Sequence, residues 1–162
     1  MEVIRNLRPL EALYLLDHAR QEMMDEESFL DTMTVYLLNE GYIDAIGHSV
    51  TMTDKGKSSR KGLRPYEIYF MEAAERQGST EGLFSRNGFF IDFIRQSIRQ
   101  SLVDRGYFLK VQTRYLPTQK YKQAMQDLYR LKRNILAGDT RDTFQISYAF
   151  PSCRGVFADI FT

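Results

Sequence analysis

The 162-residue sequence contains one cysteine, Cys153, two histidines, His18 and His48, and no tryptophan. A single cysteine allows neither an internal disulfide nor a thiolate metal cage, and this usage is expected in a reducing compartment. With only two histidines, the chain has few side chains that could bind a transition metal. Residues 78–82 lack the Gly-Lys-Ser/Thr ending of a phosphate-binding loop. Nothing in the pattern pairs a nucleophile with a base. We therefore expect no metal, no cofactor and no enzymatic activity.

The sequence also lacks long hydrophobic runs. No segment reaches the roughly 18 uninterrupted apolar residues that a membrane span requires. The first residues include acidic side chains and show no apolar stretch after a basic start. We therefore expect no membrane span and a cytoplasmic location. The 43% of hydrophobic residues is nevertheless sufficient for a core and excludes wholesale disorder.

The net charge of +1 conceals two oppositely charged parts of the chain. Residues 1–60 hold six Lys and Arg against eleven Asp and Glu, a net charge of −5. Residues 61–162 hold sixteen against ten, a net charge of +6. The first part is therefore expected to repel polyanions, whereas the second is suited to attract them.

A repeat organises the sequence. The motif Leu-Arg-Pro-x-Glu occurs at residues 7–11 and again at 63–67. Proline suits the first position of a helix, and a glutamate shortly after it suits the positive end of the helix dipole. Each copy then contains apolar residues at helical spacing that end in Gly-Tyr, at 41–42 and 106–107. Glycine at this place is typical of a helix end.

Extended segments follow each Gly-Tyr pair. Residues 42–46 and 49–53 predict two strands around a turn at 47–48, and residues 108–115 alternate loosely before Pro117. The second copy is longer, and we expect a glycine-rich loop at 78–88. Residues 118–136 have the periodicity of an amphipathic helix. The tail at 144–161 is apolar, and it is a candidate for docking on the chain or for homo-oligomer formation.

The phrases Leu-Leu-Asn-Glu-Gly-Tyr-Ile at 37–43 and Thr-Met-Thr-Asp-Lys-Gly at 51–56 resemble a winged-helix unit, in which such a turn follows the second wing strand. The tandem arrangement over residues 5–118 is also similar to the cytoplasmic soluble region of a family of bacterial predicted membrane proteins of unknown function. The chain departs from that family because it has no membrane segment. It departs from typical DNA-binding winged helices because its first unit is acidic.

These observations predict a mainly helical α+β protein with two winged-helix-like units in tandem and a C-terminal helical extension. The first unit covers residues 1–60 (the first copy) and the second covers residues 61–118 (the second copy). Residues 119–162 form a C-terminal helix and an apolar tail, which we expect to pack on the second unit.

Two functions follow from this organisation. We favour a non-catalytic protein-interaction or regulatory module, because Phe84, Phe89 and Phe90 form a candidate interaction patch beside the glycine-rich loop. Filling of the core is the simpler explanation for any one of these phenylalanines. The partner would be a protein, and its identity does not follow from the sequence.

The alternative is a DNA-binding transcriptional regulator that uses the helix at 87–105. The side chains of this helix and of the segment after it include types that read purines or contact phosphates. The candidate contacts are Arg95, Gln96, Arg99, Gln100, Lys110 and Arg114. The simpler explanation is that these residues are the solvated side of an amphipathic helix.

Overall fold

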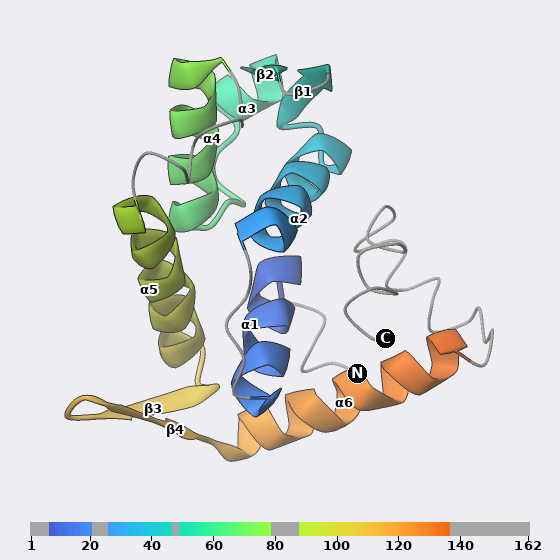
Figure 1. The fold of residues 1–162 in the computed structure, drawn as a ribbon, viewed down its shortest axis with the longest axis vertical. Coiled ribbons are helices and arrows are strands. Elements are labelled where there is room, and N and C mark those ends of the chain that lie inside the picture. Colours follow the sequence, from blue (N-terminus) through green and yellow to red (C-terminus); the bar gives the residue numbers. More distant parts are fainter. Residues whose placement is uncertain (1–6, 21–25, 47–48, 79–87, 137–162) are drawn as a thin grey trace. The chain divides into compact units, whose positions relative to one another are not determined.

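The computed structural model describes residues 7–20, 26–46, 49–78 and 88–136. The architecture is mixed α and β and mainly helical, which confirms the predicted class (Figure 1). The elements are, in order, α1 (Pro9–Arg20), α2 (Glu26–Asn39), β1 (Ile43–Ile46), β2 (Ser49–Met52), α3 (Asp54–Ser58), α4 (Pro65–Gln77), α5 (Gly88–Asp104), β3 (Phe108–Val111), β4 (Arg114–Pro117) and α6 (Gln119–Leu136). The turn expected at 47–48, most of the expected loop at 78–88 and the tail at 144–161 lie outside the described residues.

Both Leu-Arg-Pro-x-Glu motifs begin a helix, as their sequences predict. Pro9 and Pro65 are the first residues of α1 and α4. Glu11 accepts a hydrogen bond from the backbone N–H of the residue before Pro9 at 3.0 Å, and Glu67 accepts the equivalent bond at 2.7 Å. Each glutamate thereby binds a backbone donor that has no partner inside its helix.

The two Gly-Tyr pairs end α2 and α5 in the same way. Gly41 and Gly106 have φ values of 78° and 86°, in the left-handed region that glycine enters without a steric penalty. The N–H of the following residue, Tyr42 or Tyr107, donates to a carbonyl five residues earlier at 2.9 Å in both copies. This bond is typical of the Schellman motif, which binds the last carbonyls of a helix.

Each copy contains a hairpin that forms its own two-stranded antiparallel sheet. β1 pairs with β2 from Ile43↔Met52 to Ile46↔Ser49. β3 pairs with β4 from Phe108↔Pro117 to Val111↔Arg114, which leaves a two-residue turn. Gln112 occupies this turn with φ 55°, as hairpin turns of two residues require.

The described elements group into two compact units. The continuous unit consists of residues 25–97, and the discontinuous unit consists of residues 1–24 and 98–162. In the discontinuous unit α1 contacts α6, and in the continuous unit α4 contacts β2. α4 of the second copy therefore packs with the hairpin of the first copy, and α1 of the first copy lies beside the second hairpin, where the rings of Tyr14 and His18 contact that of Phe108. The sequence boundaries at 60 and 118 describe the order of the repeats along the chain and stay a prediction.

Each unit has its own buried side chains. The continuous unit buries residues of α2, β1, β2 and α4, among them Phe29, Leu37, Ile43, Val50 and Phe70. The discontinuous unit buries residues of α1, the end of α5, β3 and α6, among them Leu10, Leu16, Leu102, Phe108 and Leu128. The apolar periodicity of the sequence thus marks residues that are withdrawn from water in both units.

Candidate interaction surface

A threonine follows the second strand of each hairpin and fastens it to the glycine that ends the preceding helix. The Oγ1 of Thr53 donates to the Gly41 carbonyl at 2.6 Å, and the Oγ1 of Thr118 donates to the Gly106 carbonyl at 2.6 Å. The same oxygens accept backbone N–H groups in the first turn of α3 and α6. Threonine at these positions therefore caps a helix and closes a hairpin at once.

A lysine two residues after each threonine repeats this correspondence. The Nζ of Lys55 and that of Lys120 donate to the carbonyl of the residue directly before the glycine, at 2.6 and 2.7 Å. Lys55 lies over the ring of Tyr42 and Lys120 over that of Tyr107, at 4.4 and 4.6 Å from the ring centroids. The sequence predicts this turn in the first copy alone. The same Thr-x-Lys pattern recurs 65 residues later and marks the corresponding turn of the second copy.

The outward face of the β3–β4 hairpin carries three aliphatic side chains, Leu109, Val111 and Leu116, which we call the hairpin patch. Alternation along a strand places residues 109 and 111 on one face, and Leu116 is the cross-strand partner of Leu109. Their exposed fractions are 58%, 44% and 45%. Arg114, also exposed, faces the same side as the partner of Val111.

The opposite face of this hairpin packs within the discontinuous unit. Phe108 is buried, and its ring lies 4.9 Å from that of His18 and 5.3 Å from that of Tyr121. Tyr115, on the same face, lies under the guanidinium of Arg99, whose Cζ is 4.7 Å from the ring centroid. The hairpin patch is thus the face that remains in water after the hairpin has packed.

The hairpin of the first copy does not carry an equivalent patch. The offset of 65 residues that relates the two turns places Asp44 opposite Thr51, where the second hairpin has Leu109 opposite Leu116. Both Asp44 and Thr51 are exposed. The hairpin patch is therefore a property of the second copy and is not required by the shared architecture.

Arg99, which the sequence offered as a base-reading residue, is engaged inside the discontinuous unit. Its Nε donates to the hydroxyl of Tyr14 on α1 at 2.6 Å, while its plane covers the ring of Tyr115. A stacked and hydrogen-bonded guanidinium is held in one orientation. These contacts connect α1, α5 and β4.

The other candidate nucleic-acid contacts lie in both compact units. Arg95 and Gln96 belong to the continuous unit, where Arg95 lies 3.9 Å from the carboxylate of Asp92 and Gln96 is exposed. Gln100 belongs to the discontinuous unit and donates to Asp104 at 2.8 Å.

Lys110 and Arg114 are exposed on the second hairpin. Phe84 lies outside the described residues, as do the side chains of Phe89 and Phe90, so the predicted phenylalanine patch stays a prediction.

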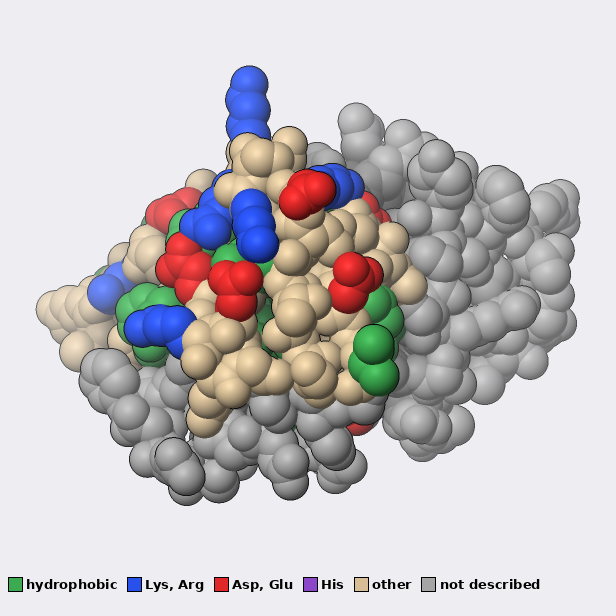
Figure 2. All heavy atoms as spheres, turned by 90° about the horizontal axis from the view of Figure 1, so that it is seen from above, with side chains coloured by type: hydrophobic (Ala, Val, Ile, Leu, Met, Phe, Trp, Pro, Cys, Tyr) green, Lys and Arg blue, Asp and Glu red, His purple; other side chains and the backbone are tan. Residues whose placement is uncertain are grey.

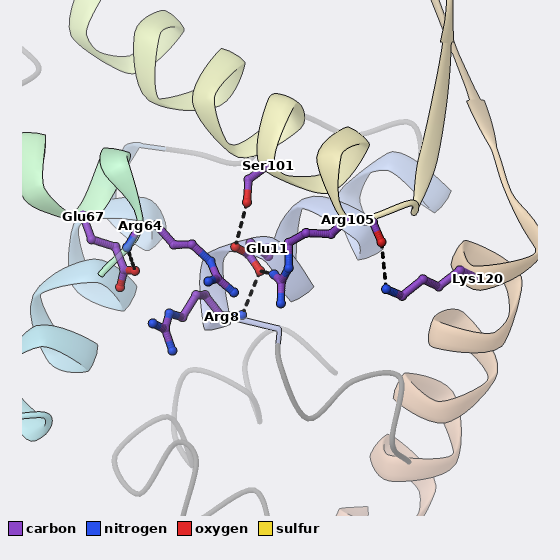
Figure 3. Close-up of polar contacts among 7 residues, drawn as sticks. All are labelled: Arg8, Glu11, Arg64, Glu67, Ser101, Arg105 and Lys120. Atoms are coloured by element: carbon purple, nitrogen blue, oxygen red, sulfur yellow. Dashed lines mark hydrogen bonds and ion pairs between the residues drawn. The ribbon is translucent and has the colours of Figure 1, made fainter. Parts of the chain in front are cut away.

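A buried carboxylate fastens α1 to the end of α5 (Figure 3). Glu11 is fully buried, and its Oε2 lies 2.6 Å from Nη1 of Arg105. Its Oε1 accepts a longer bond, 3.4 Å, from the hydroxyl of Ser101. Burial of a charge is stable only when the charge is paired and hydrogen-bonded, as it is here. The sequence predicts only the role of Glu11 at the start of α1. It does not reveal the partners Ser101 and Arg105, because they lie 90 and 94 residues further along the chain.

His18 lies at the edge of an aromatic cluster formed with Phe108 and Tyr121. Burial lowers the pKa of His18 below its ordinary value of 6.5, and the positive charge of Arg99 lowers it further. The neutral imidazole is therefore the form that the folded protein favours.

Among residues 7–20, 26–46, 49–78 and 88–136, no group of three or more His, Cys, Asp and Glu is arranged to hold a metal ion. Within the same ranges, none of the helices combines the length and the apolar character of a membrane-crossing segment.

On one face of the second hairpin, three of the exposed aliphatic side chains of the described residues gather as the hairpin patch. We compared the chain with protein-family models, curated proteins and solved structures, and none of the three comparisons gives a match.

Proposed function

We propose that this chain is a non-catalytic protein-interaction or regulatory module built from tandem winged-helix-like units, and that the hairpin patch is its contact surface. The supporting observation is the exposure of Leu109, Val111 and Leu116 on one face, at places where the first copy has polar residues or a single aliphatic one. Clustered apolar side chains in water are typical of interaction sites.

Burial of the hairpin patch by a partner would contribute a free energy of the size that the central residues of a protein interface provide. Full burial of a leucine or valine contributes about 1.5–3 kcal/mol, and these three side chains are each about half exposed. Covering them would contribute about 3 kcal/mol, which a partner must supplement with polar contacts around the rim. A few central residues often provide most of a binding energy in this way.

The test exchanges the hairpin patch for the residues of the first copy, as Leu109→Asp with Leu116→Thr. The matched control is Ile46→Thr, which removes a side chain that is 86% exposed from the other hairpin. Proteins captured by the wild-type chain are identified by mass spectrometry. The affinity of each captured protein for the wild type, for the patch variant and for the Ile46→Thr control is then measured by calorimetry.

We expect the patch variant to weaken binding at least tenfold, which corresponds to about 1.4 kcal/mol, and the control to leave it unchanged. Circular dichroism establishes that both variants are folded. Equal affinity of the patch variant and the wild type for every captured protein would refute the proposal.

The alternative, a DNA-binding regulator that reads bases with the helix at 87–105, has less support. The exposed amide of Gln96 favours it, but the contacts of Arg99 with Tyr14 and Tyr115 favour a structural role for that arginine. If α5 reads bases, Arg95→Ala with Gln96→Ala should reduce the preference among duplex sequences in a selection experiment. Unchanged preferences would count against α5 as a reader.

A further inference from the structure

One face of α6 consists of exposed polar and cationic side chains around a tyrosine. We call it the α6 stripe, and its members are Lys122, Gln126, Tyr129, Arg130 and Arg133. Their spacings of three and four residues place them on one side of the helix. The buried residues of α6, among them Ala124, Leu128 and Leu131, occupy the opposite side. The stripe extends over twelve residues, a length of about 16 Å along the helix.

Within the described residues of α6, no exposed acid accompanies the cations of the α6 stripe. From Arg105 to Leu136 the sequence holds eight Lys and Arg and a single acidic residue, Asp127. Asp127 is buried and accepts a hydrogen bond from Gln123 on its own helix, so it does not contribute an exposed carboxylate to the stripe. An ordinary solvated helix face mixes the two signs, because pairs at i and i+4 stabilise it whereas like charges destabilise it.

The continuous unit shows the ordinary mixture. In the view from above, cationic and anionic side chains lie interspersed on the described surface (Figure 2). Residues 25–97 hold eight Lys and Arg against twelve Asp and Glu, whereas residues 1–24 and 98–162 hold fourteen against nine, and the part at 98–136 accounts for nine against two. The positive charge of the chain is therefore concentrated in the discontinuous unit, and its longest helix presents part of it to water.

We propose that the α6 stripe binds the phosphate backbone of a nucleic acid without reading its sequence. Arginine and lysine neutralise phosphates and release counterions. Tyr129, 43% exposed among these cations, offers a ring on which an unpaired base stacks. The stripe contains no aliphatic side chain, so it lacks the apolar anchor that an amphipathic helix needs in order to lie in a membrane surface. This site is separate from the hairpin patch and does not depend on the proposed protein partner.

The experiment measures fluorescence anisotropy of a labelled 20-nucleotide single strand and of the matching duplex, at low and at physiological salt. The stripe variant is Lys122→Glu, Arg130→Glu and Arg133→Glu. The control variant is Lys57→Glu, Lys61→Glu and Arg76→Glu, which changes the net charge equally at exposed positions of the continuous unit. Both are checked by circular dichroism, and the glutamine versions of the same substitutions serve if the glutamate variant is unfolded.

We expect the wild-type protein to bind both nucleic acids at low salt. Its affinity for each should fall steeply as the salt concentration rises. The stripe variant should lose at least about thirtyfold in affinity, and its slope of log affinity against log salt should fall by about two to three. The control should stay within about threefold of the wild type. Tyr129→Ala should lower the affinity for the single strand more than the affinity for the duplex.

Three results would overturn the assignment. They are no binding by the wild-type protein at low salt, an equal loss in the stripe and control variants, and tighter binding to phosphatidylcholine–phosphatidylserine vesicles than to either nucleic acid. The last result would assign the stripe to a lipid surface. The hairpin patch and its partner are untouched by all three outcomes.

Discussion

At the scale of single residues, neighbours decide what each side chain does. Arg99 is of a type suited to purine recognition, yet the hydroxyl of Tyr14 and the ring of Tyr115 hold it within its own unit. Leu109 shows the opposite case. It is an aliphatic residue of a strand, a type usually found in a core, yet it is 58% exposed. Neither outcome follows from residue type, since both depend on segments that are distant in sequence.

His18 gives a prediction on pH. Its pKa in the folded protein lies below 6.5, so the unfolded chain binds the proton more readily than the folded chain. The stability contributed by the neutral imidazole is complete above pH 6.5 and is lost as the pH falls from 6.5 through the folded pKa. We expect the midpoint of thermal unfolding to fall over this window in the wild-type protein.

The measurement is thermal unfolding by circular dichroism between pH 7.5 and 5, before most carboxylates titrate. His18→Gln should flatten this part of the profile. An identical pH dependence in both proteins would show that another group is responsible.

At the scale of elements, the helix starts and ends follow from short-range rules. The Pro-x-Glu starts of α1 and α4 and the glycine ends of α2 and α5 depend on residues within one or two turns, so the sequence predicts them well. The first hairpin was also predicted, because its alternation is clear at 42–46 and 49–53. The sequence predicts a turn where the structure has the short helix α3, because the cap of this helix, Thr53, also fits the alternating pattern of the strand before it.

Gly56 in α3 gives a second prediction. Alanine usually stabilises a helix relative to glycine by about 1 kcal/mol. At position 56, however, a Cβ atom would lie 2.1 Å from the carbonyl oxygen of Tyr42, and a backbone atom cannot yield as a flexible side chain does. We expect Gly56→Ala to lower the free energy of unfolding by about 2 kcal/mol, as overpacked sites do.

Urea denaturation measures this change, and Gly62→Ala is the control, because its Cβ would lie 3.7 Å from the Tyr42 hydroxyl. A stabilised Gly56→Ala protein would contradict the close approach of α3 to the backbone of Tyr42.

At the scale of the whole molecule, the packing of each Leu-Arg-Pro-x-Glu helix with the other copy is the feature that the sequence did not reveal. The two motifs are nearly identical locally, so their partners are chosen elsewhere. The residue before the helix-ending glycine is Arg105 in the second copy and Glu40 in the first. Arg105 attracts the buried carboxylate of Glu11, and Glu40 in its place would repel it.

The third prediction is a double-mutant cycle on this pair. Glu11→Ala should lower the free energy of unfolding by about 3 kcal/mol, because it removes the buried carboxylate that Arg105, Ser101 and the backbone N–H of Arg8 bind. The double variant Glu11→Ala with Arg105→Ala should recover at least about 1 kcal/mol relative to the sum of the single changes.

The control cycle uses Arg60 and Glu72, an ion pair whose side chains are 35% and 42% exposed, for which we expect less than about 1 kcal/mol. Urea denaturation supplies all the values. If the coupling energy of Glu11 with Arg105 equals that of Arg60 with Glu72, the buried pair contributes no more to stability than an exposed one.

The discontinuous unit has a consequence for synthesis on the ribosome. The continuous unit is complete once residue 97 has left the exit tunnel, but α1 must wait for α6 before its leucines are covered. At the usual 5–20 residues per second, that wait over about a hundred residues lasts about 5–20 seconds. Throughout this interval the nascent chain carries the leucines of α1 without the helix that contacts them, so α1 is a segment on which a chaperone would act during translation.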